Sequence, residues 1–174
     1  MKHAVFGIVG WKDSGKTTLA EGLLEEFTNR GITISLVKHT HHNVDVDRPG
    51  TDSYRHRVAG AREVVLASGS RFALMHEYRN KPELELADLL DRMAPCDLVL
   101  VEGFKRTPIP KIEVHRKGKD HELIATFDSS VVAIVADFPI AKIDLPFFKQ
   151  TEVTKIADFI RDYINADNPA AASS

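Results

Sequence analysis

The sequence is poor in cysteine, in net charge and in long hydrophobic segments. Its single cysteine, Cys96, cannot form an internal disulfide, which favours a reducing, cytoplasmic location. The formal net charge of -2 differs from the basic charge typical of nucleic-acid-binding domains, so we expect no nucleic-acid partner. No apolar run approaches the roughly 20 residues of a membrane-spanning helix, and the first residues show no signal-peptide pattern, so we expect no membrane association.

What the sequence does contain is typical of a globular domain. Apolar residues make up 43% of the 174 positions and charged residues 28%, both close to average. A chain of this length buries roughly 70% of its unfolded surface, enough for a substantial core. We therefore expect one domain over residues 1–165, followed by a small polar tail, 166–174, that is disordered.

Apolar patterns along the chain predict strands that alternate with helices. We expect strands over residues 4–9, 32–37, 63–67, 72–76, 98–101, 112–115 and 131–136, and helices over 16–30, 53–59, 84–93 and 153–164. Several of the strands are continuous apolar runs, as in a sheet that is covered on both faces. The pattern predicts an α/β fold with a mainly parallel twisted sheet and helices on both faces. The strands on either side of Ser68-Gly69-Ser70 are expected to pair, so part of the sheet is antiparallel.

The stretch GWKDSGKT, residues 10–17, matches the P-loop pattern G-x-x-x-x-G-K-[ST]. It follows the first predicted strand and opens the first predicted helix, which is the context that the motif requires. The glycines let successive N–H groups point at an anion, Lys16 reaches phosphate oxygens, and the Thr17 hydroxyl suits Mg²⁺. We expect the nucleotide to be bound by Gly10, Trp11, Lys12, Asp13, Ser14, Gly15, Lys16, Thr17 and Thr18.

A second magnesium ligand is expected at the end of a neighbouring strand. The segment DLVLVEG places Asp97 at the start of an apolar strand and Glu102 at its carboxyl end. Ligands gather at the carboxyl ends of parallel strands, so we expect Thr17 and Glu102 to hold the metal, with Gly103 allowing close approach of the backbone. The alternative is that Glu102 is a solvated loop acid.

The polar segment after the second strand contains KHTHH and has two interpretations. His39, His41 and His42 would suit a transition metal. Alternatively, Lys38 and these imidazoles form a polar loop beside the phosphates.

Three aspartates, Asp45, Asp47 and Asp52, follow in the same segment. Asp47 or Asp52 would act on Mg²⁺ through water or orient an attacking water, and so they are the candidate catalytic residues. Equally, they would only cap the helix that starts near Ser53.

Asp137 follows the last strongly apolar strand. A carboxylate at this place can accept both N–H donors of a guanine edge, a pattern that adenine does not offer. The alternative is an ordinary turn aspartate before Pro139.

These motifs together resemble the MobB family, the adaptor proteins of molybdopterin-guanine dinucleotide biosynthesis. The resemblance rests on GWKDSGKTT, VKHTHHNVDVDRPGTDSY, AGA, RFALM and LVLVEGFK, in this order, and runs from about Phe6 to Asp137. It implies a homodimeric GTP-binding P-loop protein with weak Mg²⁺-dependent GTPase activity. It also implies that the protein assists a MobA-type guanylyltransferase that joins GMP to molybdopterin. Many relatives in the wider class carry an intersubunit lysine where Trp11 stands, and here Lys12 comes one place later.

Two other functions fit the same motifs. A small-molecule kinase would bind ATP at the P-loop, use Asp45 or Asp47 to take a proton from the acceptor, and close a lid with Arg55, Arg57 and Arg62. A nucleotide-dependent metallochaperone would instead carry its metal on the KHTHH segment.

Overall fold

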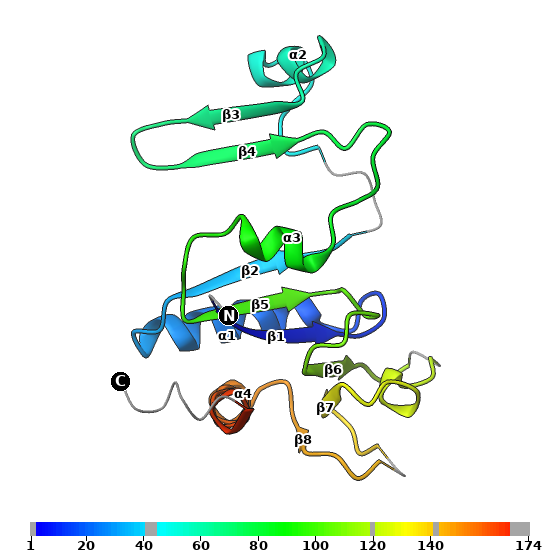
Figure 1. Cartoon of the computed structure of the whole chain (residues 1–174). Coiled ribbons are helices and arrows are strands. Elements are labelled where there is room, and N and C mark those ends of the chain that lie inside the picture. The colour runs from blue at the N-terminus through cyan, green and yellow to red at the C-terminus, as the bar shows by residue number, and fades with distance from the viewer. Residues whose placement is uncertain (1–2, 41–44, 119–120, 141–142, 168–174) are drawn as a thin grey trace. The chain divides into compact units, whose positions relative to one another are not determined.

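The computed structural model describes residues 3–40, 45–118, 121–140 and 143–167. The chain divides into two compact units. Unit 1 consists of Met1–His39 and Arg92–Ser174, and unit 2 of Thr40–Asp91. Unit 1 holds a parallel sheet with the P-loop, and unit 2 holds a hairpin with two short helices (Figure 1). The expectation of one domain over residues 1–165 stays a prediction, since a compact unit is not by itself a domain.

The sheet of unit 1 has six strands in the order β2-β5-β1-β6-β7-β8, all parallel. The strands are β1 (Ala4–Val9), β2 (Ile34–Lys38), β5 (Leu98–Glu102), β6 (Lys111–His115), β7 (Val131–Ala136) and β8 (Phe147–Phe148). β5 is buried along its whole length, as its continuous apolar run predicts. Its last residue, Glu102, pairs in register with Ile8 on one side and Lys38 on the other. The carboxyl ends of β1, β2 and β5 therefore meet at one edge of the sheet.

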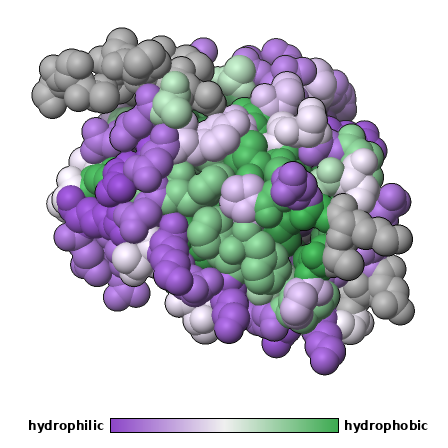
Figure 2. Space-filling view, turned by 90° about the horizontal axis from the view of Figure 1, so that it is seen from below, coloured by the Kyte–Doolittle hydropathy of each residue, from purple (hydrophilic) through white to green (hydrophobic). Residues whose placement is uncertain are grey.

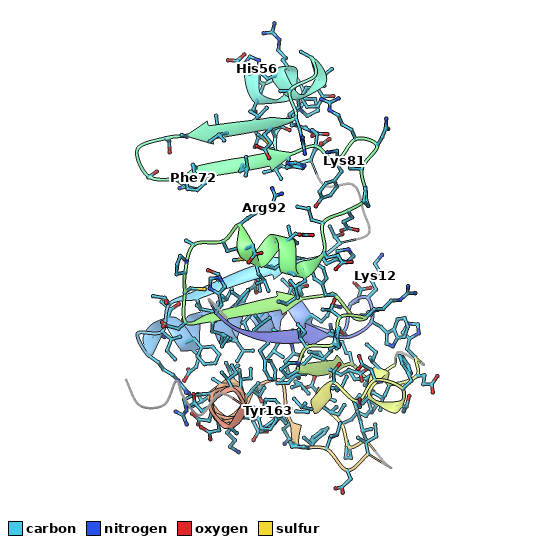
Figure 3. All side chains as sticks on the ribbon, in the orientation of Figure 1. Lys12, His56, Phe72, Lys81, Arg92 and Tyr163 are labelled. Atoms are coloured by element: carbon cyan, nitrogen blue, oxygen red, sulfur yellow. The ribbon has the colours of Figure 1, made fainter. Side chains whose placement is uncertain are left out.

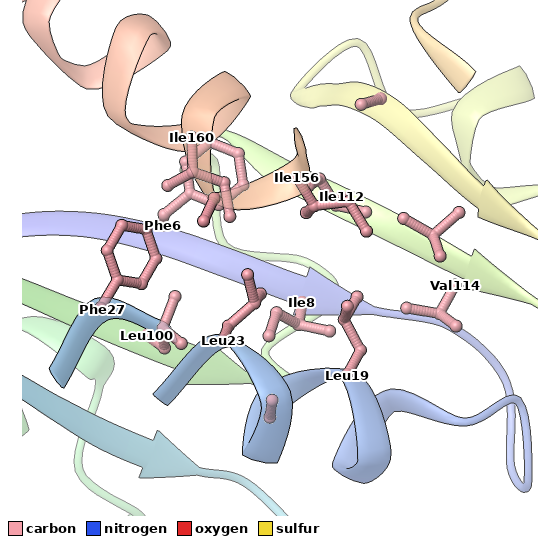
Figure 4. Close-up of a cluster of buried hydrophobic side chains, with 14 of the residues drawn as sticks. Phe6, Ile8, Leu19, Leu23, Phe27, Leu100, Ile112, Val114, Ile156 and Ile160 are labelled. Atoms are coloured by element: carbon pink, nitrogen blue, oxygen red, sulfur yellow. The ribbon is translucent and has the colours of Figure 1, made fainter. Parts of the chain in front are cut away.

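Two long helices cover one face of this sheet. They are α1 (Lys16–Asn29) and α4 (Val153–Asp167), which contact each other over the strands. Leu19, Leu23 and Phe27 follow the helical period and are all buried, opposite Ile156 and Ile160 of α4 (Figure 4). This packing fixes α1, and therefore the loop that precedes it.

A second buried cluster occupies the opposite face of β1 and β7, because its strand residues alternate with those of the first cluster. Val9 and Ile134 meet the short 3-10 helix η1 (Ile124–Thr126) there. The buried Glu113 carboxylate of β6 accepts hydrogen bonds from the backbone N–H groups of Ile124 (3.0 Å) and Ala125 (2.9 Å). Burial raises the pKa of this carboxyl group.

Unit 2 is built around a two-stranded antiparallel sheet. It contains α2 (Asp52–Val58), β3 (Glu63–Ala67), β4 (Phe72–His76) and α3 (Leu86–Asp91). Within the hairpin, Val65 pairs with Leu74 and Ala67 with Phe72. Arg57 of α2 gathers acids from the segments around it, as described below.

The structure confirms the α/β fold with a mainly parallel sheet, and it confirms the antiparallel pair at the predicted bounds. All four helix predictions were wrong at one or both ends. α1 ends at Asn29, α2 runs over Asp52–Val58, α3 is limited to Leu86–Asp91, and α4 continues to Asp167. The strand β8 and the helix η1 were not predicted. Within the described residues, no helix has both the length and the apolar character needed to span a bilayer.

Candidate functional site

In the loop from Gly10 to Gly15, the backbone conformation at the first and last residues favours glycine. Gly10 has φ +150° and Gly15 has φ +98°, both in the region that favours glycine. A Cβ at Gly10 would lie 2.3 Å from the carbonyl oxygen of Val114, so a side chain cannot fit there. Asp13 also has a positive φ, +61°. The loop is thus a tight curl between β1 and α1, as the P-loop pattern predicts.

The amino end of α1 is open to an anion. Gly15 is its N-cap and, among the described residues, no side chain caps it and no acidic residue lies in its first turn. The free N–H groups and the helix dipole both favour a negatively charged ligand. Ser14 is buried, and its hydroxyl oxygen has no hydrogen-bond partner among the described residues. The Lys16 ammonium donates to the Trp11 carbonyl at 2.7 Å, and burial, the largest cause, lowers its pKa.

Three polar groups converge at the carboxyl ends of β2 and β5. The Thr17 hydroxyl donates to Glu102 Oε1 at 3.0 Å. The Lys38 ammonium lies 3.1 Å from the same carboxylate oxygen and donates to Thr17 Oγ1 at 3.2 Å. The Glu102 side chain is 6% exposed, whereas that of Lys38 is 50% exposed. A buried carboxylate therefore faces a lysine that can reach solvent.

This group of oxygens fits a hard divalent cation. Glu102 Oε2 is buried and has no hydrogen-bond partner among the described residues. A buried carboxylate oxygen without a partner is costly, and a metal ion would satisfy it. A hydroxyl and a carboxylate side by side are ligands that Mg²⁺ prefers. The predicted pair, Thr17 and Glu102, is therefore brought together.

Trp11 lies at the centre of contacts that the sequence did not predict. Its indole N–H donates to the Glu122 carbonyl at 2.9 Å, and its ring lies 4.9 Å from that of His121. The Lys105 ammonium lies 4.0 Å from the centre of the indole ring, a cation–π contact. Burial lowers the pKa of Lys105. The P-loop is thus fixed through its aromatic residue as well as through its backbone.

A pocket of about 350 Å³ opens beside the carboxyl end of β7. Its lining is Ile134, Asp137, Phe138, Pro139, Ile140, Ile143, Leu145, Phe147 and Lys149. Hydrophobic side chains gather on the face of the molecule shown in Figure 2, with hydrophilic ones around them. Five lining residues also belong to the hydrophobic cluster against which Trp11 of the P-loop packs: Ile134, Phe138, Ile140, Ile143 and Leu145.

The segment that carries this pocket also contacts the P-loop directly. The Gln150 side-chain amide donates to the Gly15 carbonyl at 3.0 Å. Sequence reasoning missed both Gln150 and Lys149, because neither belongs to a motif and both reach the site through long-range contacts. Asp137, which it did predict, is exposed at the pocket together with Lys149.

The predicted catalytic aspartates belong to unit 2 and form ion pairs there. Both carboxylate oxygens of Asp47 accept hydrogen bonds from Arg57, which holds the pKa of Asp47 below its ordinary value. Arg57 also pairs with Asp45 and Glu77. These contacts favour a structural role for Asp47, and they occupy an arginine that the kinase interpretation would place in a lid.

Asp52 is the first residue of α2 rather than its N-cap, which is Thr51. The Asp52 carboxylate is exposed and lies 3.7 Å from Arg55. Its predicted capping role at the N-cap position was therefore wrong by one residue. The catalytic role of Asp47 and Asp52 stays a prediction.

The KHTHH segment is described only at its start. His41 and His42 lie outside the described residues. His39 donates its backbone N–H to the Glu102 carbonyl at 2.9 Å, and its ring lies 4.8 Å from that of Phe104. Gly103 passes close to His39, since a Cβ at Gly103 would lie 3.1 Å from the His39 backbone oxygen. Across the described parts of the chain, no three His, Cys, Asp or Glu side chains are placed to hold a metal.

A glycine-rich loop between a central parallel strand and a helix, with an acid at the end of the next strand, defines the P-loop class of α/β proteins. The family model described as molybdopterin guanine dinucleotide synthesis protein B matches residues 5–137. The chain therefore belongs to the MobB family, which confirms the resemblance seen in its motifs.

Individual relatives agree with this assignment. The chain is 40% identical over 169 residues to the molybdopterin-guanine dinucleotide biosynthesis adapter protein of Escherichia coli K12, covering 94% of this chain and 95% of that one. The Haemophilus influenzae adapter protein is 42% identical over 162 residues, with 92% and 89% covered. The crystal structure of a MobB homologue from Bacillus stearothermophilus superposes with a TM-score of 0.70 at 25% identity, covering 95% and 99% of the two chains. A further crystal structure, of molybdopterin-guanine biosynthesis protein B, gives 0.72 at 26% identity, with 91% and 99% covered.

Proposed function

We propose that this protein is a GTP-binding adaptor that assists the attachment of GMP to molybdopterin. The observation that carries the proposal is the P-loop, whose curled backbone and uncapped α1 lie beside the buried Glu102. Such a site binds a chain of phosphates through N–H groups, Lys16 and the helix dipole. The family and the adapter proteins to which the chain is similar support the pathway.

The pocket beside the P-loop supports guanine as the base. Asp137 can accept from the two N–H donors of guanine, and Lys149 can donate to its carbonyl oxygen. Adenine offers an acceptor where guanine offers a donor, so the same two side chains would fit it poorly. The pocket volume of about 350 Å³ lies within the range of small-molecule sites.

Mg²⁺ is the proposed metal, held by Thr17 and Glu102. When bound, it neutralises charge on the phosphates. We expect hydrolysis to be slow, because Arg57 occupies both carboxylate oxygens of Asp47, one of the two candidates for orienting water. Function then depends on a partner, for which we propose a MobA-type guanylyltransferase and its substrate molybdopterin.

We also propose that the protein acts as a homodimer, and the hairpin of unit 2 supports this. Val65, Phe72 and Leu74 share one face of β3 and β4 and are 61%, 75% and 46% exposed. Figure 3 labels Phe72 on β4. A two-stranded hairpin is marginally stable alone, so burying this face against a second copy would stabilise it. Sedimentation analysis should show a dimer in the wild type and a shift to monomer in Phe72→Ser, whereas Arg71→Ser should stay dimeric. A wild-type monomer at micromolar concentration would contradict the proposal.

Calorimetric titration with GTP and with ATP, each with Mg²⁺, tests the central proposal. We expect the wild type to prefer GTP and Asp137→Asn to lose that preference. Lys16→Ala should weaken GTP binding by about 2 to 3 kcal/mol, because a charge-assisted contact to phosphate is removed. Lys155→Ala is the matched control, since Lys155 lies on α4 and pairs with Glu152. Equal GTP affinity in the wild type and Lys16→Ala would refute the site assignment.

A further inference from the structure

The Lys38 ammonium occupies the place where the two proposed magnesium ligands meet. It lies 3.1 Å from Glu102 Oε1 and 3.2 Å from Thr17 Oγ1, and these two oxygens are themselves 3.0 Å apart. The contact follows from the sheet, because Lys38 and Glu102 are register partners at the last positions of β2 and β5. Neighbouring residues in register on parallel strands point to the same face, so the lysine is directed at the carboxylate.

A divalent ion and this ammonium cannot share the same oxygens. Mg²⁺ binds its ligands at about 2.0 to 2.1 Å, so an ion held by both oxygens would lie close to the ammonium that contacts the same two atoms. Two cations at that separation repel strongly in a partly buried site. One of them has to leave when the other arrives.

The burial of the two partners decides which group moves. The Glu102 side chain is 6% exposed and belongs to a fully buried strand, so it stays in place. The Lys38 side chain is 50% exposed and has a flexible four-carbon stem. It can swing away without disturbing the core.

We propose that Lys38 is a built-in counter-ion that holds the metal position in the nucleotide-free protein and must be displaced when Mg²⁺ binds. The inference rests on the proposed magnesium site. Without nucleotide, Lys38 balances the buried carboxylate and weakens binding of the divalent ion. A triphosphate brings several negative charges, which attract the metal and also receive the freed ammonium. Metal and nucleotide therefore bind together, and the bare metal binds poorly.

Electron paramagnetic resonance titration with Mn²⁺, used in place of Mg²⁺, tests this on the full-length protein without nucleotide. We expect Lys38→Met to bind Mn²⁺ about tenfold more tightly than the wild type, as expected when about 1.4 kcal/mol of repulsion is removed. The double variant Lys38→Met/Glu102→Gln should lose the gain, because the carboxylate that binds the ion is gone. Lys38→Gln serves as a second variant if the methionine disturbs folding, which circular dichroism shows.

Lys155→Met is the matched control. It also removes one lysine from an ion pair with a carboxylate, since Lys155 of α4 lies 2.6 Å from Glu152, the residue before the helix. It should leave Mn²⁺ affinity unchanged. An equal gain in Lys155→Met, or no gain in Lys38→Met and Lys38→Gln, would overturn the proposal. If Lys38→Met gains Mn²⁺ affinity but the wild type binds no GTP in calorimetry, the GTP-binding function fails while the role of Lys38 stands.

Discussion

Lys111 is a buried cation that organises the loop after Glu102. Its side chain is 1% exposed, and its ammonium donates to the carbonyls of Lys105 (3.1 Å) and Thr107 (2.7 Å) and to the Asp128 carboxylate (2.9 Å). All three donors of the ammonium are thus used. Replacing Lys111 with methionine keeps most of the apolar stem and removes all three hydrogen bonds.

The expected cost of Lys111→Met follows from what it leaves behind. Removing one partner of a buried ion pair costs about 3 to 5 kcal/mol. Asp128 is 23% exposed and retains hydrogen bonds from Ser130, so part of its charge is stabilised without the lysine. The two carbonyls lose their donor. We therefore expect a loss of about 3 kcal/mol in the free energy of unfolding, at the lower end of that range.

Urea unfolding followed by circular dichroism measures this loss. Lys117→Met is the control, because Lys117 is exposed just after the same strand and should change stability by less than about 0.5 kcal/mol. GTP affinity of Lys111→Met should also fall, since Lys105 and its contact with Trp11 belong to the loop that Lys111 holds. A loss of stability below about 1 kcal/mol would refute the reasoning, because it would mean that the orphaned groups are readily solvated.

Three further substitutions test the P-loop, the stability of the protein at acid pH, and the ion pairs of unit 2. Gly10→Ala should abolish GTP binding and lower the thermal midpoint, because its Cβ would meet the Val114 carbonyl; unchanged binding in calorimetry would contradict this. The pKa of Asp97 is lowered from 3.8 mainly by the hydrogen bond from the Thr33 hydroxyl. The ionised Asp97 carboxylate therefore stabilises the folded state above pH 3.8, and this contribution is lost as the pH falls below that value. Thr33→Val should reduce the loss of folding stability between about pH 5 and pH 3. Arg57→Met should speed hydrogen exchange within unit 2 and leave unit 1 unchanged, whereas equal protection in both forms would show that the acid cluster is dispensable.

Elements with a strong local signal could be predicted from the sequence. The predicted bounds of β3 and β4 matched the structure because two apolar runs lie on either side of the turn that begins at Ser68. The structure closes this turn with the backbone N–H and the hydroxyl of Ser68, which both donate to the Arg71 carbonyl. The prediction of β7 matched because its continuous apolar run, VVAIVA, is rich in β-branched residues, which favour strands. The P-loop was predictable for the same reason, since all its residues are consecutive.

Elements that depend on distant partners could not be predicted. β8 has two residues, Phe147 and Phe148, and exists only because they pair with Ile134 and Val135 of β7. Lys111 is a charged residue that sequence patterns place at the surface, yet its ammonium is satisfied by a loop and an aspartate that come together only in the fold. The early end of α3 at Asp91 has no account in the described contacts.

The acidic residues proposed for the site also differ in whether local sequence or distant contacts decide their role. Glu102 was placed correctly because its strand is apolar and its position at the carboxyl end follows from the parallel sheet. Asp47 has an equally suggestive sequence context, but its carboxylate is taken by Arg57, ten residues further along the chain. Lys38 was assigned to a polar loop, whereas strand order places it beside Glu102. A carboxylate near a P-loop can therefore bind metal only where the cation paired with it can move away, as the half-exposed Lys38 can. Which cation pairs with it is decided by contacts that the motif does not contain.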